Sequence, residues 1–70
     1  MTWEKSVYSS NVQTVGYDAD SKELYITWTR GKQSIYSGVP AQLADDLANA
    51  PSVGSMLNAE IKPYYGHRYA

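Results

Sequence analysis

The sequence predicts an α+β domain in which a three-stranded antiparallel meander is followed by two short helices packed on one face of the sheet. Three observations lead to this class. In three segments before residue 40, apolar residues follow the period of two that half-buried strands show. Short polar turns separate these segments, and consecutive tight turns make neighbouring strands antiparallel. Beyond Pro40, apolar residues recur at the spacing of an amphipathic helix.

The alternation is clearest in the second predicted strand, where Leu24, Ile26 and Trp28 share one face. A polar stretch rich in turn-forming residues precedes this strand, and a turn containing Gly31 follows it. Both turns are short enough for hairpins, so the three strands should be neighbours in the sheet. The predicted strands are residues 10–17, 23–29 and 33–39.

Two prolines delimit the predicted helices. Pro40 suits the first turn of a helix, where its missing N–H removes no hydrogen bond. The first helix should end near Asn49, because Pro51 breaks the pattern, and Ser52 is able to cap a second helix. This second helix should end at Lys62–Pro63. Two helices laid on the apolar face of the sheet complete a two-layer domain.

Length and composition predict one domain over residues 1–70, with a core at about residues 9–62 and a tyrosine-rich C-terminal tail at residues 63–70. A chain this short buries only about 60% of its unfolded surface. It also has no cysteine for disulfides, so we expect a homo-oligomer. The sequence has no signal-peptide pattern and no apolar run long enough to span a bilayer. We therefore expect a cytoplasmic protein without a membrane partner.

The sequence does not supply a set of catalytic or metal-ligating residues. His67 is the only histidine, which rules out a multi-histidine metal site. Asp18 and Asp20 lack the third acidic position and the glycine of a calcium-binding loop. We expect no metal, no cofactor and no enzymatic activity. One catalytic alternative stays open, in which His67 forms an acid–base pair with a carboxylate of a neighbouring subunit.

The strongest local indication of binding is the start of the second predicted helix. Backbone amides and a partial positive charge at a helix start favour an anion, and Gly54 permits close approach. The alternative is an ordinary cap with a glycine needed for close helix packing. Rings near the C-terminus would stack on a base while a cation meets a phosphate. The candidate ligand-binding residues from these features are Ser52, Gly54, Ser55, Tyr36, Lys62, Tyr64, Tyr65, His67 and Arg68.

Charge and aromatic content favour a small anion over a long polymer as the ligand. Six basic residues stand against seven acidic ones, giving a net charge of -1, whereas a polyanion binder clusters many cations. Seven tyrosines and two tryptophans, with no phenylalanine, give every ring a polar group suited to a half-wet surface. The cations in segments with few acids predict a small basic patch. They are Arg30, Lys32, Lys62, His67 and Arg68.

Across positions 9–66 the sequence contains a series of spaced residues: Ser9-Ser10-Asn11, Gly16-Tyr17-Asp18, Tyr36, Val39-Pro40, Ala50-x-Ser52-x-Gly54, Asn58 and Ile61. This series resembles the KTSC domain family. The family takes its name from a domain at the C-terminus of some lysyl-tRNA synthetases, and similar domains occur alone in small bacterial and phage proteins. The resemblance implies the same strand–strand–strand–helix–helix order. Of the family's Tyr-x-Tyr pair in the third strand, Tyr36 matches the second tyrosine and Ser34 stands at the first. The resemblance also adds Asn58, one turn beyond the start of the second helix, to the candidate ligand-binding residues.

Three functional hypotheses follow. The first is a non-catalytic module for a small nucleotide-like anion, similar in size and type of site to the small phage anti-defence proteins that sequester nucleotide immune signals. The second is an RNA-binding accessory domain, in keeping with the synthetase association, with Tyr25, Trp28 and Tyr36 as a stacking platform. The third is a protein-interaction or assembly module that uses exposed tyrosines.

Overall fold

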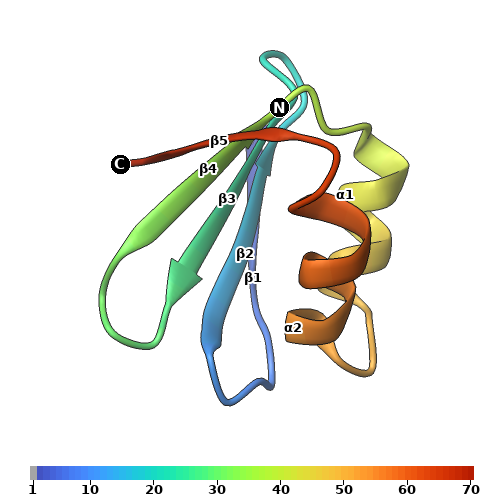
Figure 1. Ribbon diagram of the computed structural model, residues 1–70. Coiled ribbons are helices and arrows are strands. Elements are labelled where there is room, and N and C mark those ends of the chain that lie inside the picture. The colour runs from blue at the N-terminus through green and yellow to red at the C-terminus, as the bar shows by residue number, and fades with distance from the viewer. Residues whose placement is uncertain (1) are drawn as a thin grey trace.

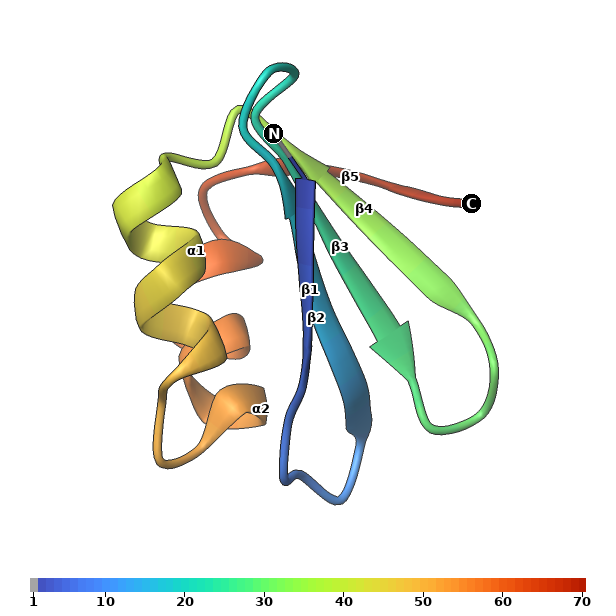
Figure 2. The same ribbon diagram turned by 180° about the vertical axis from the view of Figure 1, so that it is seen from behind.

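A computed structural model describes residues 2–70, which form a five-stranded antiparallel sheet with a helical layer on one face (Figure 1). The strands are β1 (Thr2–Ser6), β2 (Val12–Asp18), β3 (Glu23–Trp28), β4 (Gln33–Ser37) and β5 (Gly66–Tyr69). Strand order follows chain order, so β1 and β5 are the two edges. The reverse view shows that no helix of the described residues covers the other face (Figure 2).

The α+β class and the three predicted strands are confirmed, but the prediction of only three strands is wrong because the sheet has five. Both additional strands are edges with little buried surface. In β1 only Trp3 is half-buried, and all four residues of β5 are exposed. An exposed edge strand is held by backbone hydrogen bonds and needs no alternation of apolar residues. The predicted tail at residues 63–70 therefore contains a fifth strand, which pairs with β4.

Local backbone preferences fix the turns between β2 and β3 and between β3 and β4. The Asp18 carboxylate accepts a hydrogen bond from the Asp20 N–H at 3.0 Å, the arrangement that lets aspartate begin a turn. In the β3–β4 turn, Gly31 has a φ of 91°, a conformation that glycine adopts without steric cost. The Trp28 N–H donates to the Lys32 carbonyl at 2.8 Å and closes this turn. Arg30 and Lys32 are consequently held beside the end of β3.

The helical layer consists of α1 (Ala41–Ala48), α2 (Val53–Met56) and η1 (Leu57–Ile61). Pro40 is the N-cap of α1 and lies one residue before its predicted place in the first turn, while Asn49 ends the helix as expected. Ser52 precedes α2, which continues directly into η1. In η1 the chain is π-helical: the Lys62 N–H donates to the Leu57 carbonyl, five residues earlier, at 2.9 Å.

The core lies between the helical layer and the inner face of β2, β3 and β4. Leu24 stands opposite both Tyr17 and Tyr36 in the sheet register, and all three side chains are buried. The Tyr17 hydroxyl donates a hydrogen bond to the Val39 carbonyl, so the buried phenol has a partner. The core comprises Val12, Val15, Tyr17, Leu24, Ile26, Tyr36, Val39, Ala44, Leu47, Ala48, Val53, Leu57 and Ile61.

The buried hydrogen bond of Tyr17 is testable with Tyr17→Phe. We expect the free energy of unfolding to fall by about 1–3 kcal/mol, because the buried Val39 carbonyl loses its donor. Urea unfolding followed by circular dichroism measures this change. Tyr64→Phe is the matched control, since that ring is 72% exposed, and should change stability by less than about 0.5 kcal/mol. Equal losses in both variants would contradict the role of the buried hydroxyl.

The buried phenol of Tyr17 also determines how the stability of the domain responds to alkaline pH. Burial raises the pKa of Tyr17, and the nearby Asp18 charge raises it further. The unfolded chain therefore releases the phenol proton at a lower pH than the folded chain does. Stability is retained below about pH 10 and falls as the pH rises above it. Between about pH 9 and pH 11, the urea midpoint of Tyr17→Phe should fall less than that of the wild type. Parallel pH curves would refute this.

Candidate functional site

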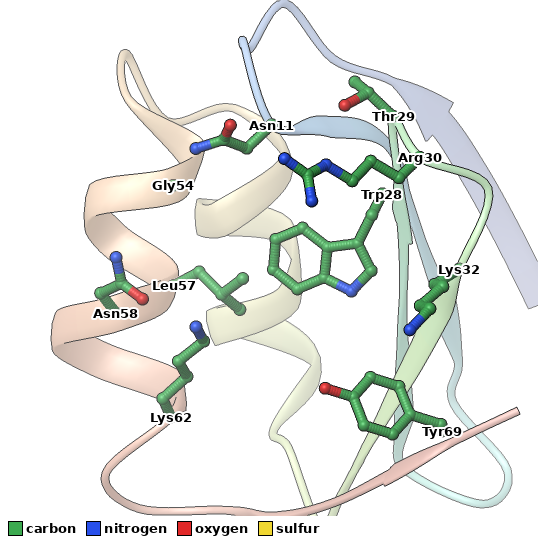
Figure 3. A pocket seen from close by; sticks show the side chains of 10 residues that line it. All are labelled: Asn11, Trp28, Thr29, Arg30, Lys32, Gly54, Leu57, Asn58, Lys62 and Tyr69. Carbon is green, nitrogen blue, oxygen red and sulfur yellow. The ribbon is translucent and has the colours of Figure 1, made fainter.

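Two adjoining pockets lie where η1 meets the end of the β3–β4 hairpin, and the Trp28 indole stands between these elements (Figure 3). We call the two pockets together the Trp28 groove. Its first lobe has a volume of about 320 Å³ and its second lobe about 290 Å³. Trp28, Lys62 and Tyr69 line both lobes, so the two are continuous. The groove is built from three separate parts of the chain.

Trp28 is fixed in place by its position and by one hydrogen bond. It ends β3 on the same face as Leu24 and Ile26, but it is only half-buried. The indole N–H donates to the Ser34 hydroxyl at 2.8 Å. Ser34 is itself 1% exposed and lines the second lobe, so this bond ties the indole to the sheet. The position at which the family pattern has its first tyrosine thus carries the small residue that orients Trp28.

Three cations surround the indole without a carboxylate to neutralise them. Arg30 and Lys32 come from the β3–β4 turn, and Lys62 follows η1. The Lys62 ammonium lies 5.6 Å from the centre of the Trp28 ring, and the Lys32 ammonium lies 5.9 Å from the centre of the Tyr69 ring. Within residues 2–70, none of the three forms an ion pair, and no acidic residue lines either lobe. The groove therefore attracts anions.

The second lobe adds a cluster of rings from β4 and β5. The strand register places His67 opposite Tyr36, and the two rings stack with centres 5.1 Å apart. Tyr69 meets the His67 ring edge-on at 4.8 Å. Burial raises the pKa of Tyr36, and its interaction with Tyr69 raises it further, so the phenol keeps its proton in neutral solution. The lobe therefore offers aromatic surface and hydroxyl groups.

The opposite wall of the first lobe comes from α2 and η1. Asn58 and Lys62 both line it, and their side chains lie along the groove side of the helical layer in Figure 3. π-Helical turns such as η1 occur frequently at functional sites. A Cβ atom at Gly54 would meet no atom within 4 Å, so close packing does not require this glycine. The absence of a side chain at Gly54 leaves the wall open.

The structure brings half of the predicted ligand-binding residues into the groove. They come from β4, from β5, from α2, and from η1 and the position after it. A cavity at this place was not predicted, because its two walls are distant in sequence and meet only through packing. The predicted residues that line the groove are Tyr36, Gly54, Asn58, Lys62 and His67.

The structure does not bring the other five predicted residues to the groove lining. The Ser52 hydroxyl donates to the Ser55 hydroxyl at 3.0 Å at the exposed start of α2. Tyr64 is 72% exposed, and Tyr65 packs against the core. Arg68 lies on the uncovered face of the sheet, because alternate residues of β5 point to opposite faces. Ser52 and Ser55 therefore lie outside the groove lining, although Gly54 between them is part of it.

Arg68 is occupied by a network on the uncovered face. It forms an ion pair with Glu23 and donates to the Ser37 hydroxyl at 3.2 Å. The Tyr25 hydroxyl also donates to Glu23, at 3.0 Å. Chiefly through the Arg68 hydrogen bond, these contacts lower the pKa of the Glu23 carboxyl. Since Tyr25 lies on this face and Tyr36 is buried, the three rings expected as an RNA platform do not share one exposed surface.

Sequence reasoning did not assign a site role to Asn11, Thr29 or Leu57, which also line the first lobe. Arg30 and Lys32 entered only through the distribution of charges, and Tyr69 only as one of the C-terminal rings expected to stack on a base. One signal was available for this part of the site. A tryptophan at a strand end, followed within four residues by Arg30 and Lys32, places a ring beside two cations. Asn11 gave no comparable signal, because it reaches the groove from the loop before β2.

Fold and groove together define a small α+β domain with one helix-covered sheet face and a cationic, aromatic groove at its border. A model of the KTSC domain matches residues 8–65. The crystal structure of a KTSC domain protein from Yersinia pestis matches with a TM-score of 0.88 and 28% identity, covering 100% of this chain and 99% of that one. The chain belongs to the KTSC domain family, which confirms the resemblance.

Two relatives extend this comparison to other bacteria. A protein of Tsukamurella paurometabola is 36% identical over 59 residues, covering 84% of this chain and 88% of that protein. A protein of Stutzerimonas stutzeri is 30% identical over 64 residues, covering 91% of this chain and 89% of that protein. Both are therefore similar to this chain over nearly their whole lengths.

Residues 2–70 contain no cluster of three His, Cys, Asp or Glu side chains placed to hold a metal ion. Among the helices of the same residues, none is long and apolar enough to cross a membrane.

The unpaired cations predict how ions quench the fluorescence of Trp28. In Trp3→Phe, which leaves Trp28 as the single tryptophan, each quenching constant is divided by that of N-acetyltryptophanamide, because iodide is intrinsically the stronger quencher. The iodide ratio should be at least about twice the caesium ratio at low ionic strength. Adding Arg30→Ala should lower the iodide ratio. Lys5→Ala is the control, since Lys5 donates to Asn49 away from the groove. Equal ratios for the two ions would show that the groove does not concentrate anions.

Proposed function

We propose that the protein is a non-catalytic binding module that holds a small nucleotide-like anion in the Trp28 groove. One observation carries this proposal: three cations surround Trp28 and Tyr69, and among residues 2–70 none of the three forms an ion pair and no carboxylate lines the groove. A nucleotide combines a flat ring, which stacks on aromatic side chains, with a phosphate that accepts charge-assisted hydrogen bonds. The groove offers partners for both parts of such a ligand.

The dimensions and contacts of the groove support a ligand of this size. A volume of about 320 Å³ falls at the lower end of the range for small-molecule sites, about 300–1,000 Å³. Stacking of a base on an aromatic ring contributes about 1–3 kcal/mol. A hydrogen bond to a charged group contributes about 1.5–3 kcal/mol. One stacked base and two such contacts, less the cost of association, are compatible with a dissociation constant of about 0.1–1 mM.

Charge distribution supports a small ligand better than an RNA strand. The net charge is -1, and Arg68, which would extend a basic track, is paired with Glu23 on the other face. We further propose that the module acts by sequestering its ligand, as the small phage proteins named above do. The predicted homo-oligomer, the cytoplasmic location and the absence of catalysis stay predictions. So does the use of exposed tyrosines for assembly.

Titration with AMP tests the proposal directly. We expect calorimetry at low salt to show binding that Trp28→Ala abolishes and Lys62→Ala weakens about tenfold, because each removes one of the proposed contacts. Lys5→Ala, which removes a cation outside the groove, should bind as the wild type does. Circular dichroism checks that each variant is folded. The absence of binding by AMP and ADP at millimolar concentration would refute the proposal.

Salt dependence separates this function from the RNA alternative. For a mononucleotide, the logarithm of the affinity should fall with the logarithm of salt concentration with a slope of about -1 to -2. An RNA strand that contacts many phosphates gives a steeper slope. The measurement repeats the AMP titration at several salt concentrations and adds an oligonucleotide. Tight, steeply salt-dependent binding of the oligonucleotide without AMP binding would favour the RNA-binding domain.

A further inference from the structure

The two lobes of the Trp28 groove differ in what they offer a ligand. The first lobe is lined by Arg30, Lys32 and Asn58, and the neighbouring Leu57 and Gly54 leave room beside the indole. The second lobe is lined by rings, among them the stacked pair of Tyr36 and His67. Each lobe by itself is about as large as the smallest ligand sites, about 300 Å³. A single base with its phosphate would fill only one of them.

Lys62 stands where the two lobes join. It lines both, its ammonium lies 5.6 Å from the centre of the Trp28 ring, and no described carboxylate pairs with it. Figure 3 shows its side chain reaching from the helical layer towards the indole. Trp28 and Tyr69 are the other residues common to both lobes. The junction therefore offers a cation beside the Trp28 ring.

We propose that the groove takes a dinucleotide: two bases, one in each lobe, joined through a phosphate that Lys62 contacts. The inference rests on the proposed function and names the class of ligand. One base stacks on Trp28 beside Asn58, whose carboxamide has no partner among the described residues. The other stacks against His67 and Tyr69. Arg30 remains for further phosphate oxygens at the outer end of the first lobe.

Comparison of AMP with the dinucleoside monophosphate ApA isolates the contribution of the second base. ApA carries one phosphate, as AMP does, but a smaller negative charge, so electrostatic attraction alone would make it bind more weakly. We expect ApA to bind at least about tenfold more tightly than AMP, because its second base gains a stacking surface. Isothermal calorimetry at fixed salt gives both dissociation constants.

His67→Ala tests the placement of the second base. It should reduce the affinity for ApA to about that of the wild type for AMP, because His67 lines the second lobe, where the second base is placed. Tyr64→Ala, at an exposed ring outside the groove, should change neither affinity. Unchanged ApA binding in folded His67→Ala would overturn the placement.

The outcomes distinguish this inference from the function on which it rests. AMP binding without a gain for ApA would overturn the dinucleotide and leave the nucleotide-binding function intact. No binding of either would overturn both. A single-stranded decamer of adenylate distinguishes a free dinucleotide from two adjacent residues of a strand. Affinity equal to that of ApA, after correction for the number of sites, supports the free ligand, while affinity more than about tenfold higher overturns it.

Discussion

The whole structure depends on one constraint. Two short helical segments have to cover the apolar inner face of the sheet. α1 has eight residues and α2 with η1 has nine, so each helical segment extends only about 12–14 Å. These segments bury Val15, Leu24 and Ile26, while Trp28, the next inward residue of β3, is only half-buried at the border. A small domain that covers its sheet incompletely leaves a large aromatic side chain at the edge of its core. The groove forms at this border.

Backbone pairing between β4 and β5 supplies the other half of the site. Gly66–Tyr69 contributes no buried residue to the core, yet its register against β4 sets His67 over Tyr36 and directs Tyr69 towards Lys32. The same pairing sends Arg68 to the opposite face, where Glu23 neutralises it. One strand thus adds aromatic surface to the groove and keeps a paired charge away from it.

The sequence predicted those parts of the fold in which burial or backbone hydrogen bonding restricts the residue types that can occur. Alternation revealed the middle strands because one of their faces is buried, and prolines bounded the helices because they interrupt backbone hydrogen bonds. The edge strands left no such trace. At the site, Lys62 and His67 were foreseen from residue type, and Asn58 from the family resemblance. Without knowing that residues 66–69 form a strand, nothing could separate the face of His67 from that of Arg68.

Gly54 has a consequence for motion in this part of the molecule. A glycine weakens a helix by about 1 kcal/mol relative to alanine, and α2, with four residues, begins at Ser52 without a side-chain cap. Amide hydrogens of α2 should accordingly exchange with solvent through local opening, while those of β2 and β3 exchange only when the whole domain unfolds. The wall of the groove that contains α2 thus has a lower local stability than the sheet that forms the other wall.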